Sequence, residues 1–135
     1  MALFAWDNSY SVGVQDLDLQ HKKLVDTLNQ LHQDMLNRHS REETGVLLNQ
    51  LATYTVDHFI TEERYFARTQ YPKMGEHKRQ HAELTAQVKD YITRYNRGEI
   101  SLDIHLLDFL CKWLMNHILR EDMEYGPWLN RAGIR

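Results

Sequence analysis

The most constraining feature of this sequence is a set of seven side chains with metal-binding chemistry at helical spacing. Five are histidines and two are carboxylates: His21, His58, Glu62, His77, His81, His117 and Asp122. Residues four apart share one face of a helix, so His58 and Glu62 point the same way, as do His77 and His81. We therefore predict a two-metal cluster inside a helical bundle.

Apolar residues at helical spacing divide most of the chain into four predicted helices. We expect the first helix at about 18–38 and the third at about 73–96. The second helix should begin after a capping box formed by Ser40 and Glu43 and end at about 67. The fourth should begin after an N-cap at Ser101 and end at Gly126-Pro127. Residues 1–17 then form an irregular arm that carries Phe4, Trp6 and Tyr10. A short tail with Trp128 and Leu129 follows the last helix.

Short connections between these helices favour an all-α, up-down-up-down antiparallel four-helix bundle, formed by one domain over residues 1–135. This topology makes a prediction about the seven side chains. His21 and the His77/His81 pair lie near the starts of the first and third helices. The His58/Glu62 and His117/Asp122 pairs lie toward the ends of the second and fourth. Because helix direction alternates, all four groups should meet at one end of the bundle.

The pair His117 and Asp122 fits this scheme least well, because the two residues are five apart. An ideal helix turns about 100° per residue, which would separate them by about 140°. Asp122 can reach the cluster only if the turn between them loosens or widens.

Imidazoles and carboxylates without thiolates suit iron, zinc, copper or manganese. Suppose that Glu62, Asp122 and one solvent-derived oxygen bridge two six-coordinate metals. The three bridges and five histidines then fill eleven of twelve coordination positions. The pattern describes a dinuclear centre with one vacancy for a small ligand.

Simpler interpretations were weighed against this one. A single histidine on an apolar helix face is most often a core residue, and the His77/His81 pair alone could be a surface zinc site. Glu62, followed by Glu63 and Arg64, could belong to a solvated face. The chain lacks the paired Glu-x-x-His motifs of ferritin-like proteins, an HExxH motif and a CxxCH motif. Non-covalent haem between two histidines remains open, but it would leave five of the seven unused.

Composition narrows the partners and the compartment. The net charge of −3 provides no basic surface, so we expect no nucleic-acid partner. No stretch is long and apolar enough for membrane insertion, and the N-terminus does not resemble a signal peptide, which predicts a cytoplasmic protein. We expect a monomer. The single cysteine, Cys111, excludes an internal disulfide and is expected to have a packing role.

The motifs together resemble the hemerythrin family, and its single-domain bacterial members in particular. The matching segments are Val12-Gly13-Val14, Asp18-Leu-Gln-His21, His58-Phe-Ile-Thr-Glu62, His77-Lys-Arg-Gln-His81 and His117-Ile-Leu-Arg-Glu-Asp122. The five-residue spacing of His117 and Asp122 matches the family pattern, and the resemblance covers nearly the whole chain.

The resemblance implies two non-haem iron ions bridged by an oxo or hydroxo group, Glu62 and Asp122. His77, His81 and His117 would saturate one iron, while His21 and His58 would hold the other. The family binds O2 reversibly, end-on as a hydroperoxide, at the five-coordinate iron. Apolar side chains near the ligands match the family's oxygen pocket and could equally be ordinary core: Leu24, Phe59, Trp113, Leu114 and Ile118.

The leading hypothesis is therefore a non-enzymatic O2-binding protein for storage, transport or delivery, with an O2-consuming protein as a candidate partner. Two other classes use the same site. One is a di-iron enzyme: a peroxidase, an oxidase or a nitric oxide reductase. The other is an O2 or redox sensor that acts on a separate partner.

Overall fold

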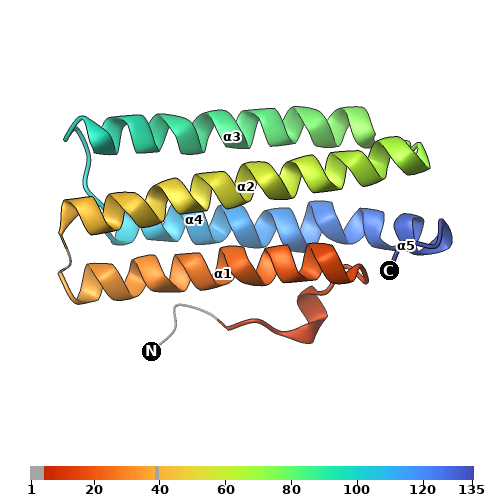
Figure 1. The fold of residues 1–135 in the computed structure, drawn as a ribbon, viewed down its shortest axis with the longest axis horizontal. Coiled ribbons are helices and arrows are strands. Elements are labelled where there is room, and N and C mark those ends of the chain that lie inside the picture. Colours follow the sequence, from red (N-terminus) through yellow and green to blue (C-terminus); the bar gives the residue numbers. More distant parts are fainter. Residues whose placement is uncertain (1–4, 39) are drawn as a thin grey trace.

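The computed structural model describes residues 5–38 and 40–135 and confirms the predicted bundle. Its long helices are α1 (Gln15–Leu36), α2 (Arg41–Thr69), α3 (Met74–Asn96) and α4 (Ile104–Asn116). They alternate in direction along the chain (Figure 1). A π-helical segment, η2 (His117–Asp122), joins α4 to a last helix, α5 (Met123–Arg131).

The helices pack around two hydrophobic clusters. The larger cluster fills the bundle with the apolar stripes of α1 to α4, including Leu24, Leu51, Leu107 and Leu114. The smaller cluster lies where α1, α2 and α5 meet and contains Leu17, Phe66, Tyr125 and Leu129, among others. Burial of these stripes, more than intrinsic helix propensity, stabilises the helices.

The helix boundaries follow from capping. Ser40 caps α2 as predicted, because its hydroxyl accepts a hydrogen bond from the Glu43 backbone nitrogen. The expected cap at Ser101 was wrong. Asp103 caps α4 by accepting from the backbone nitrogen of Leu106, whereas the Ser101 hydroxyl accepts a hydrogen bond from Arg41. Gly98, with a φ of 76°, follows the end of α3 as predicted.

The predicted C-terminal tail was also wrong, because the chain remains helical through Gly126 and Pro127. Trp128 and Leu129 lie within α5, and Leu129 is fully buried. A proline inside a helix removes one backbone hydrogen bond. Burial of Tyr125 and Leu129 on either side of Pro127 offsets that loss.

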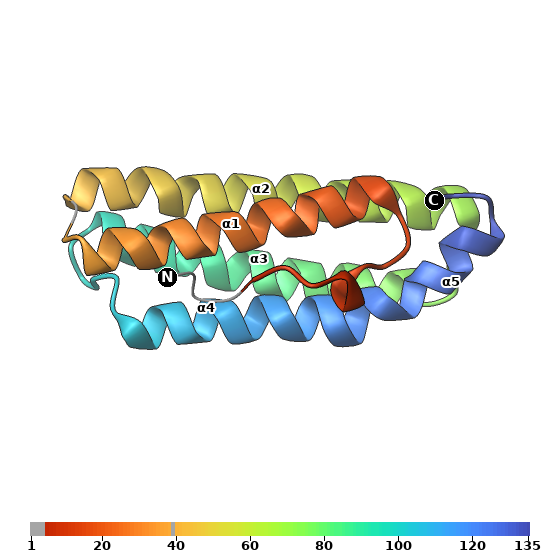
Figure 2. The ribbon, with the colours of Figure 1, turned by 90° about the horizontal axis from the view of Figure 1, so that it is seen from below.

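The N-terminal arm is shorter than predicted, since α1 begins at Gln15. Its described part contains the short 3₁₀-helix η1 (Asn8–Tyr10) and runs beside α1 and α4 (Figures 1 and 2). Asp18 holds the arm by accepting hydrogen bonds from the Ser11 hydroxyl and the Val12 backbone nitrogen. Phe4, which was assigned to the arm, lies outside the described residues.

The arm also makes a close contact with α5 that requires a glycine. A Cβ atom at Gly126 would collide with the carbonyl oxygen of Val12, whereas a Cβ at Gly75 in α3 would have no neighbour within 4 Å. We expect Gly126→Ala to destabilise the protein by about 1–3 kcal/mol, because the backbone of the arm must move. Gly75→Ala is the matched control and should not destabilise. Chemical denaturation of both variants measures the difference, and equal stabilities would contradict the proposed contact.

None of the helices in the described part of the chain is long and apolar enough to cross a membrane.

Candidate metal centre

The π-helical segment η2 solves the spacing problem of His117 and Asp122. A π-helix pairs residues five apart, so it brings positions i and i+5 to the same face. His117 begins η2 and Asp122 ends it, and both side chains are buried. This confirms the expectation that the turn between them must widen.

All seven predicted residues converge at one end of the bundle, and none is more than 4% exposed. They come from α1 (His21), α2 (His58, Glu62), α3 (His77, His81) and η2 (His117, Asp122). These residues form two groups. Within each group, one nitrogen or oxygen atom from every member lies within 4.8 Å of those of the other members. One group is Glu62, His77, His81 and His117; the other is His21, His58, Glu62 and Asp122.

Asp122 lies between the two sets of histidines. Its Oδ1 atom is 3.2 Å from Nε2 of His77 and 3.1 Å from Nε2 of His117. Its Oδ2 atom is 2.7 Å from Nε2 of His21 and 3.5 Å from Nε2 of His58. Each oxygen of this carboxylate therefore faces a different set of histidines, which is the arrangement that a bridging carboxylate needs.

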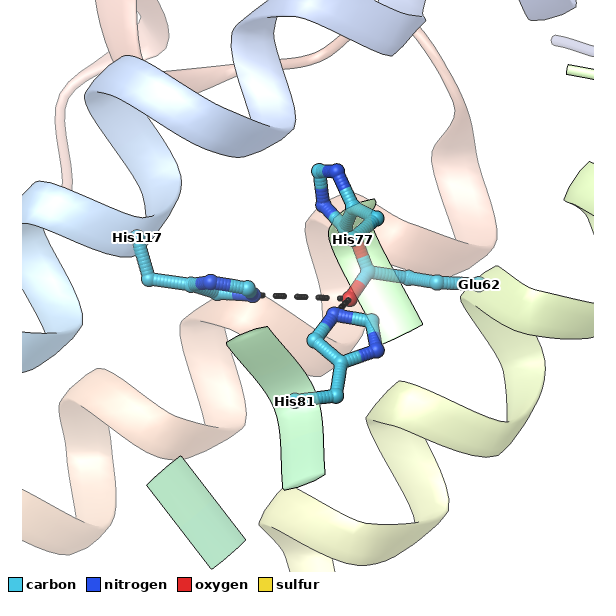
Figure 3. Close-up of side chains that lie close together, drawn as sticks. All are labelled: Glu62, His77, His81 and His117. Atoms are coloured by element: carbon cyan, nitrogen blue, oxygen red, sulfur yellow. Dashed lines mark ion pairs between the residues drawn. The ribbon is translucent and has the colours of Figure 1, made fainter. Parts of the chain in front are cut away.

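Glu62 belongs to both groups. Its Oε1 atom lies 3.1 Å from Nε2 of His58, 3.3 Å from Nε2 of His81 and 3.5 Å from Nε2 of His117. Figure 3 shows His81 and His117 directed at the same oxygen of Glu62. Two carboxylates, one from α2 and one from η2, thus join the two sets of histidines.

The chemistry of this cluster fits a pair of metal ions. Within the described part of the chain, both oxygens of Glu62 and Nε2 of His81 are buried and make no well-aligned hydrogen bond, even though Oε1 of Glu62 faces three histidine nitrogens. Leaving such polar atoms unsatisfied costs about 1–3 kcal/mol each. Metal coordination would satisfy them, and imidazole with carboxylate suits borderline transition metals such as iron.

The electrostatics of the cluster also favour a cation. Burial opposes ionisation of Glu62 and Asp122, but the surrounding histidines hold the pKa of both carboxyls below their ordinary values. Burial lowers the pKa of His58, but attraction to Glu62 and contacts with Asp122 outweigh it and raise this pKa to about 9. Burial, together with the charge on His58, lowers the pKa of His21. The buried carboxylates of Glu62 and Asp122 therefore keep a proton on His58, and a bound metal ion would replace that proton.

Comparison with known proteins agrees with this geometry. Residues 12–129 match the family model described as "Hemerythrin HHE cation binding domain". The chain belongs to the hemerythrin family. It is 34% identical over 131 residues to a bacteriohemerythrin of Methylococcus capsulatus, covering 96% of this chain and 99% of that one. It is 30% identical over 122 residues to a myohemerythrin of Riftia pachyptila, covering 90% of each.

The fold agrees as well. The crystal structure of a wild-type hemerythrin superposes with a TM-score of 0.89 at 33% identity, over 95% of this chain and 98% of that one. Family membership, the bundle and the buried histidine–carboxylate cluster thus point to the same kind of centre.

The five side chains predicted to line an oxygen pocket are all buried in the larger hydrophobic cluster: Leu24, Phe59, Trp113, Leu114 and Ile118. The Phe59 ring stacks on the His81 ring with centroids 3.8 Å apart. The Trp113 ring is parallel to the His117 ring at 6.4 Å. Their place in the larger hydrophobic cluster is clear, and the pocket role remains a prediction.

Several residues around the cluster were not predicted. Gln20 and Glu63 contact the outer ring nitrogens of two histidines, at 2.8 Å from Nδ1 of His58 and 3.2 Å from Nδ1 of His81. Gln20 directly precedes His21 and Glu63 directly follows Glu62, which is the only signal that the sequence offered.

Tyr125 is the other unpredicted neighbour, one turn after Asp122. It is fully buried, and burial with the charges of Asp122 and Glu62 raises the pKa of its hydroxyl well above the ordinary value. Its ring lies 5.7 Å from that of His77. Tyr125 therefore closes the side of the cluster that faces the smaller hydrophobic cluster.

Three further histidines lie outside the seven-residue set: His32, His39 and His105. His32 is partly buried and His105 is exposed, while His39 lies outside the described residues. Cys111 is half-buried, and burial raises the pKa of its thiol to about 11, which suits packing better than catalysis.

Proposed function

We propose that this hemerythrin-family chain binds O2 reversibly, for storage, transport or delivery, at a pair of non-haem iron ions. In this proposal His77, His81 and His117 hold one ion and His21 and His58 hold the other. Glu62, Asp122 and a solvent-derived oxo or hydroxo group bridge them. The observation that carries the proposal is Asp122, whose two oxygens face the two sets of histidines.

The iron pair, when bound, supplies the two electrons that a reversible O2 complex requires. The chain supplies the surroundings. Five neutral imidazoles and only two carboxylates form the cluster, and a shell with few anions gives little support to highly oxidised iron. The ion held by His21 and His58 would have one histidine fewer than the other, and it would therefore keep a position for a small ligand.

Apolar side chains keep water and protons away from that position. Leu24, Leu114 and Ile118 are fully buried, and the Phe59 ring lies 6.0 Å from the ring of His58, which holds the ion with the vacancy in this proposal. An O2 carrier needs such a dry pocket, because water and protons promote irreversible oxidation of the iron. We propose that the chain is a binding protein and not an enzyme for this reason.

The test is the stoichiometry and fate of O2. Reduced protein with two iron ions per chain should take up one O2 per chain and return it when O2 is removed, with little net consumption in the presence of a mild reductant. Sustained consumption of O2, peroxide or nitric oxide under the same conditions would overturn the proposal in favour of an enzyme.

Metal binding should also release a proton at neutral pH. His58 has a pKa of about 9 in the metal-free protein, so it is protonated at pH 7.5 and must lose that proton when Nε2 binds a metal. The affinity for Zn²⁺ should therefore rise as the pH rises from 7 toward 9, and the proton release should diminish near pH 9. Calorimetry in two buffers of different ionisation enthalpy measures the release. Binding that is independent of pH over this range would contradict the role of His58.

A further inference from the structure

The outer ring nitrogens of the cluster histidines have unequal partners. Nδ1 of His81 lies 3.2 Å from a carboxylate oxygen of Glu63. Nδ1 of His58 lies 2.8 Å from the amide oxygen of Gln20, whose own nitrogen donates to the Thr61 hydroxyl. Within the described part of the chain, Nδ1 of His21 is buried without a hydrogen-bond partner. A negative charge thus stands behind one histidine of the first set. In the second set a neutral amide stands behind His58, and within the described residues no acceptor stands behind His21.

This difference matters because each ring has its Nε2 atom in the cluster. The Nδ1 atom then carries the hydrogen and donates it to the partner behind the ring. Donation to a carboxylate makes the imidazole a more basic ligand, whereas donation to an amide orients the ring without adding charge. The Nδ1 atom of His21 has no acceptor among the described residues, so its ring is neither oriented nor made more basic in this way.

Glu63 is placed to exert this effect from a partly buried position. Its side chain is 27% exposed, and Nζ of Lys78, which is largely exposed, lies 4.0 Å from the oxygen that does not contact His81. The ion pair with Lys78 is long and solvated, so it offsets little of the charge that His81 experiences. By contrast, the side chain of His81 is only 3% exposed. Water therefore screens the interaction between Glu63 and His81 only weakly.

We propose that Glu63 and Gln20 separate the two metal positions in affinity, beyond the difference that their ligand counts create. Glu63 strengthens the position of His77, His81 and His117, which therefore fills first. Gln20, which adds no charge, and the Nδ1 atom of His21, which has no acceptor among the described residues, leave the other position weaker and its ion more labile. The inference rests on the ligand assignment of the proposed function, in which the weaker position is the one with the vacancy.

The experiment is an anaerobic titration of the metal-free protein with Co²⁺ against a competing chelator. Two binding steps are expected. Glu63→Gln keeps an oxygen that can accept from His81 but removes the charge, and it should weaken the tighter step about tenfold while leaving the weaker step unchanged. Gln20→Glu adds the charge behind His58 and should strengthen the weaker step by about the same factor.

Two controls separate this effect from others. Glu83→Gln removes one exposed carboxylate from α3 and should shift neither step. In a His21→Ala background, which lacks a ligand of the weaker position, Glu63→Gln should still weaken the tighter step. Circular dichroism of each metal-free variant checks that the helices are retained.

The outcomes are distinct from those that test O2 binding. If Glu63→Gln leaves the tighter step unchanged, or weakens both steps equally, Glu63 only orients His81 or adds general charge and the inference is overturned. Because Co²⁺ binding without O2 is the readout, the inference can stand even if the iron-loaded protein fails to bind O2. Conversely, reversible O2 binding with no effect of either substitution would overturn the inference alone.

Discussion

Glu62→Gln is expected to weaken both metal positions together and to abolish O2 binding. Glu62 is the side chain that belongs to both groups of the cluster, and its Oε1 atom faces histidines of both. Loss of a hydrogen-bonding partner behind a metal ligand costs about 10–100-fold in affinity, so loss of a bridging ligand should cost at least that for each ion. Metal analysis after dialysis against a weak chelator should find less than one ion per chain.

The control for Glu62→Gln is Glu83→Gln, which makes the same chemical change at an exposed position of α3. It should retain two ions per chain. Circular dichroism is needed for both, since Glu62→Gln leaves the buried histidines with one anion fewer. Retention of two tightly bound ions by a folded Glu62→Gln protein would contradict the bridging role.

Leu114→Ala is expected to speed irreversible oxidation of the O2-bound protein. Leu114 is fully buried in α4 and precedes His117 by about one turn. Truncation opens a space beside the cluster that can admit water and protons. We expect autoxidation to accelerate on the order of tenfold, which corresponds to about 1.4 kcal/mol of activation free energy. The decay of the oxygenated spectrum measures this rate directly.

The matched control for Leu114→Ala is Leu107→Ala. Leu107 is equally buried on the same helix, two turns further from the cluster. Both variants should lose about 2–5 kcal/mol of stability, because each leaves a cavity in the core. Only Leu114→Ala should oxidise faster. Equal autoxidation rates in the two variants would show that general loosening, and not a local barrier at Leu114, controls the oxidation.

The cluster and the bundle could be predicted from sequence because their signals are periodic. His58 and Glu62, like His77 and His81, lie one turn apart, and antiparallel helices bring both pairs to the same end of the bundle. The position of Asp122 was harder to predict, because it follows His117 by five residues. A regular helix with this spacing would point Asp122 away from the cluster. The structure meets the requirement with the π-helical segment η2.

The features that were not predicted depend on contacts between distant parts of the chain. The local sequence does not show that Asp103, and not Ser101, caps α4. The Ser101 hydroxyl instead accepts a hydrogen bond from Arg41, which lies sixty residues earlier in the chain. The extension of the last helix through Pro127 depends on burial of Tyr125 and Leu129.

The partner of His81 was missed for the same reason. Glu63 was considered only as a sign that Glu62 could belong to a solvated face, yet α3 brings the His81 ring against Glu63. Sequence spacing predicts which residues share a helix face, but it does not predict which side chain of a neighbouring helix meets them.

Reversible O2 binding is tested most directly by an absorption spectrum of reduced, iron-loaded protein before O2 is admitted, after it is admitted and after it is removed again. Reversible binding predicts a charge-transfer band that appears with O2, disappears when O2 is removed and returns through repeated cycles. Conversion to a ferric spectrum that never reverts would contradict it.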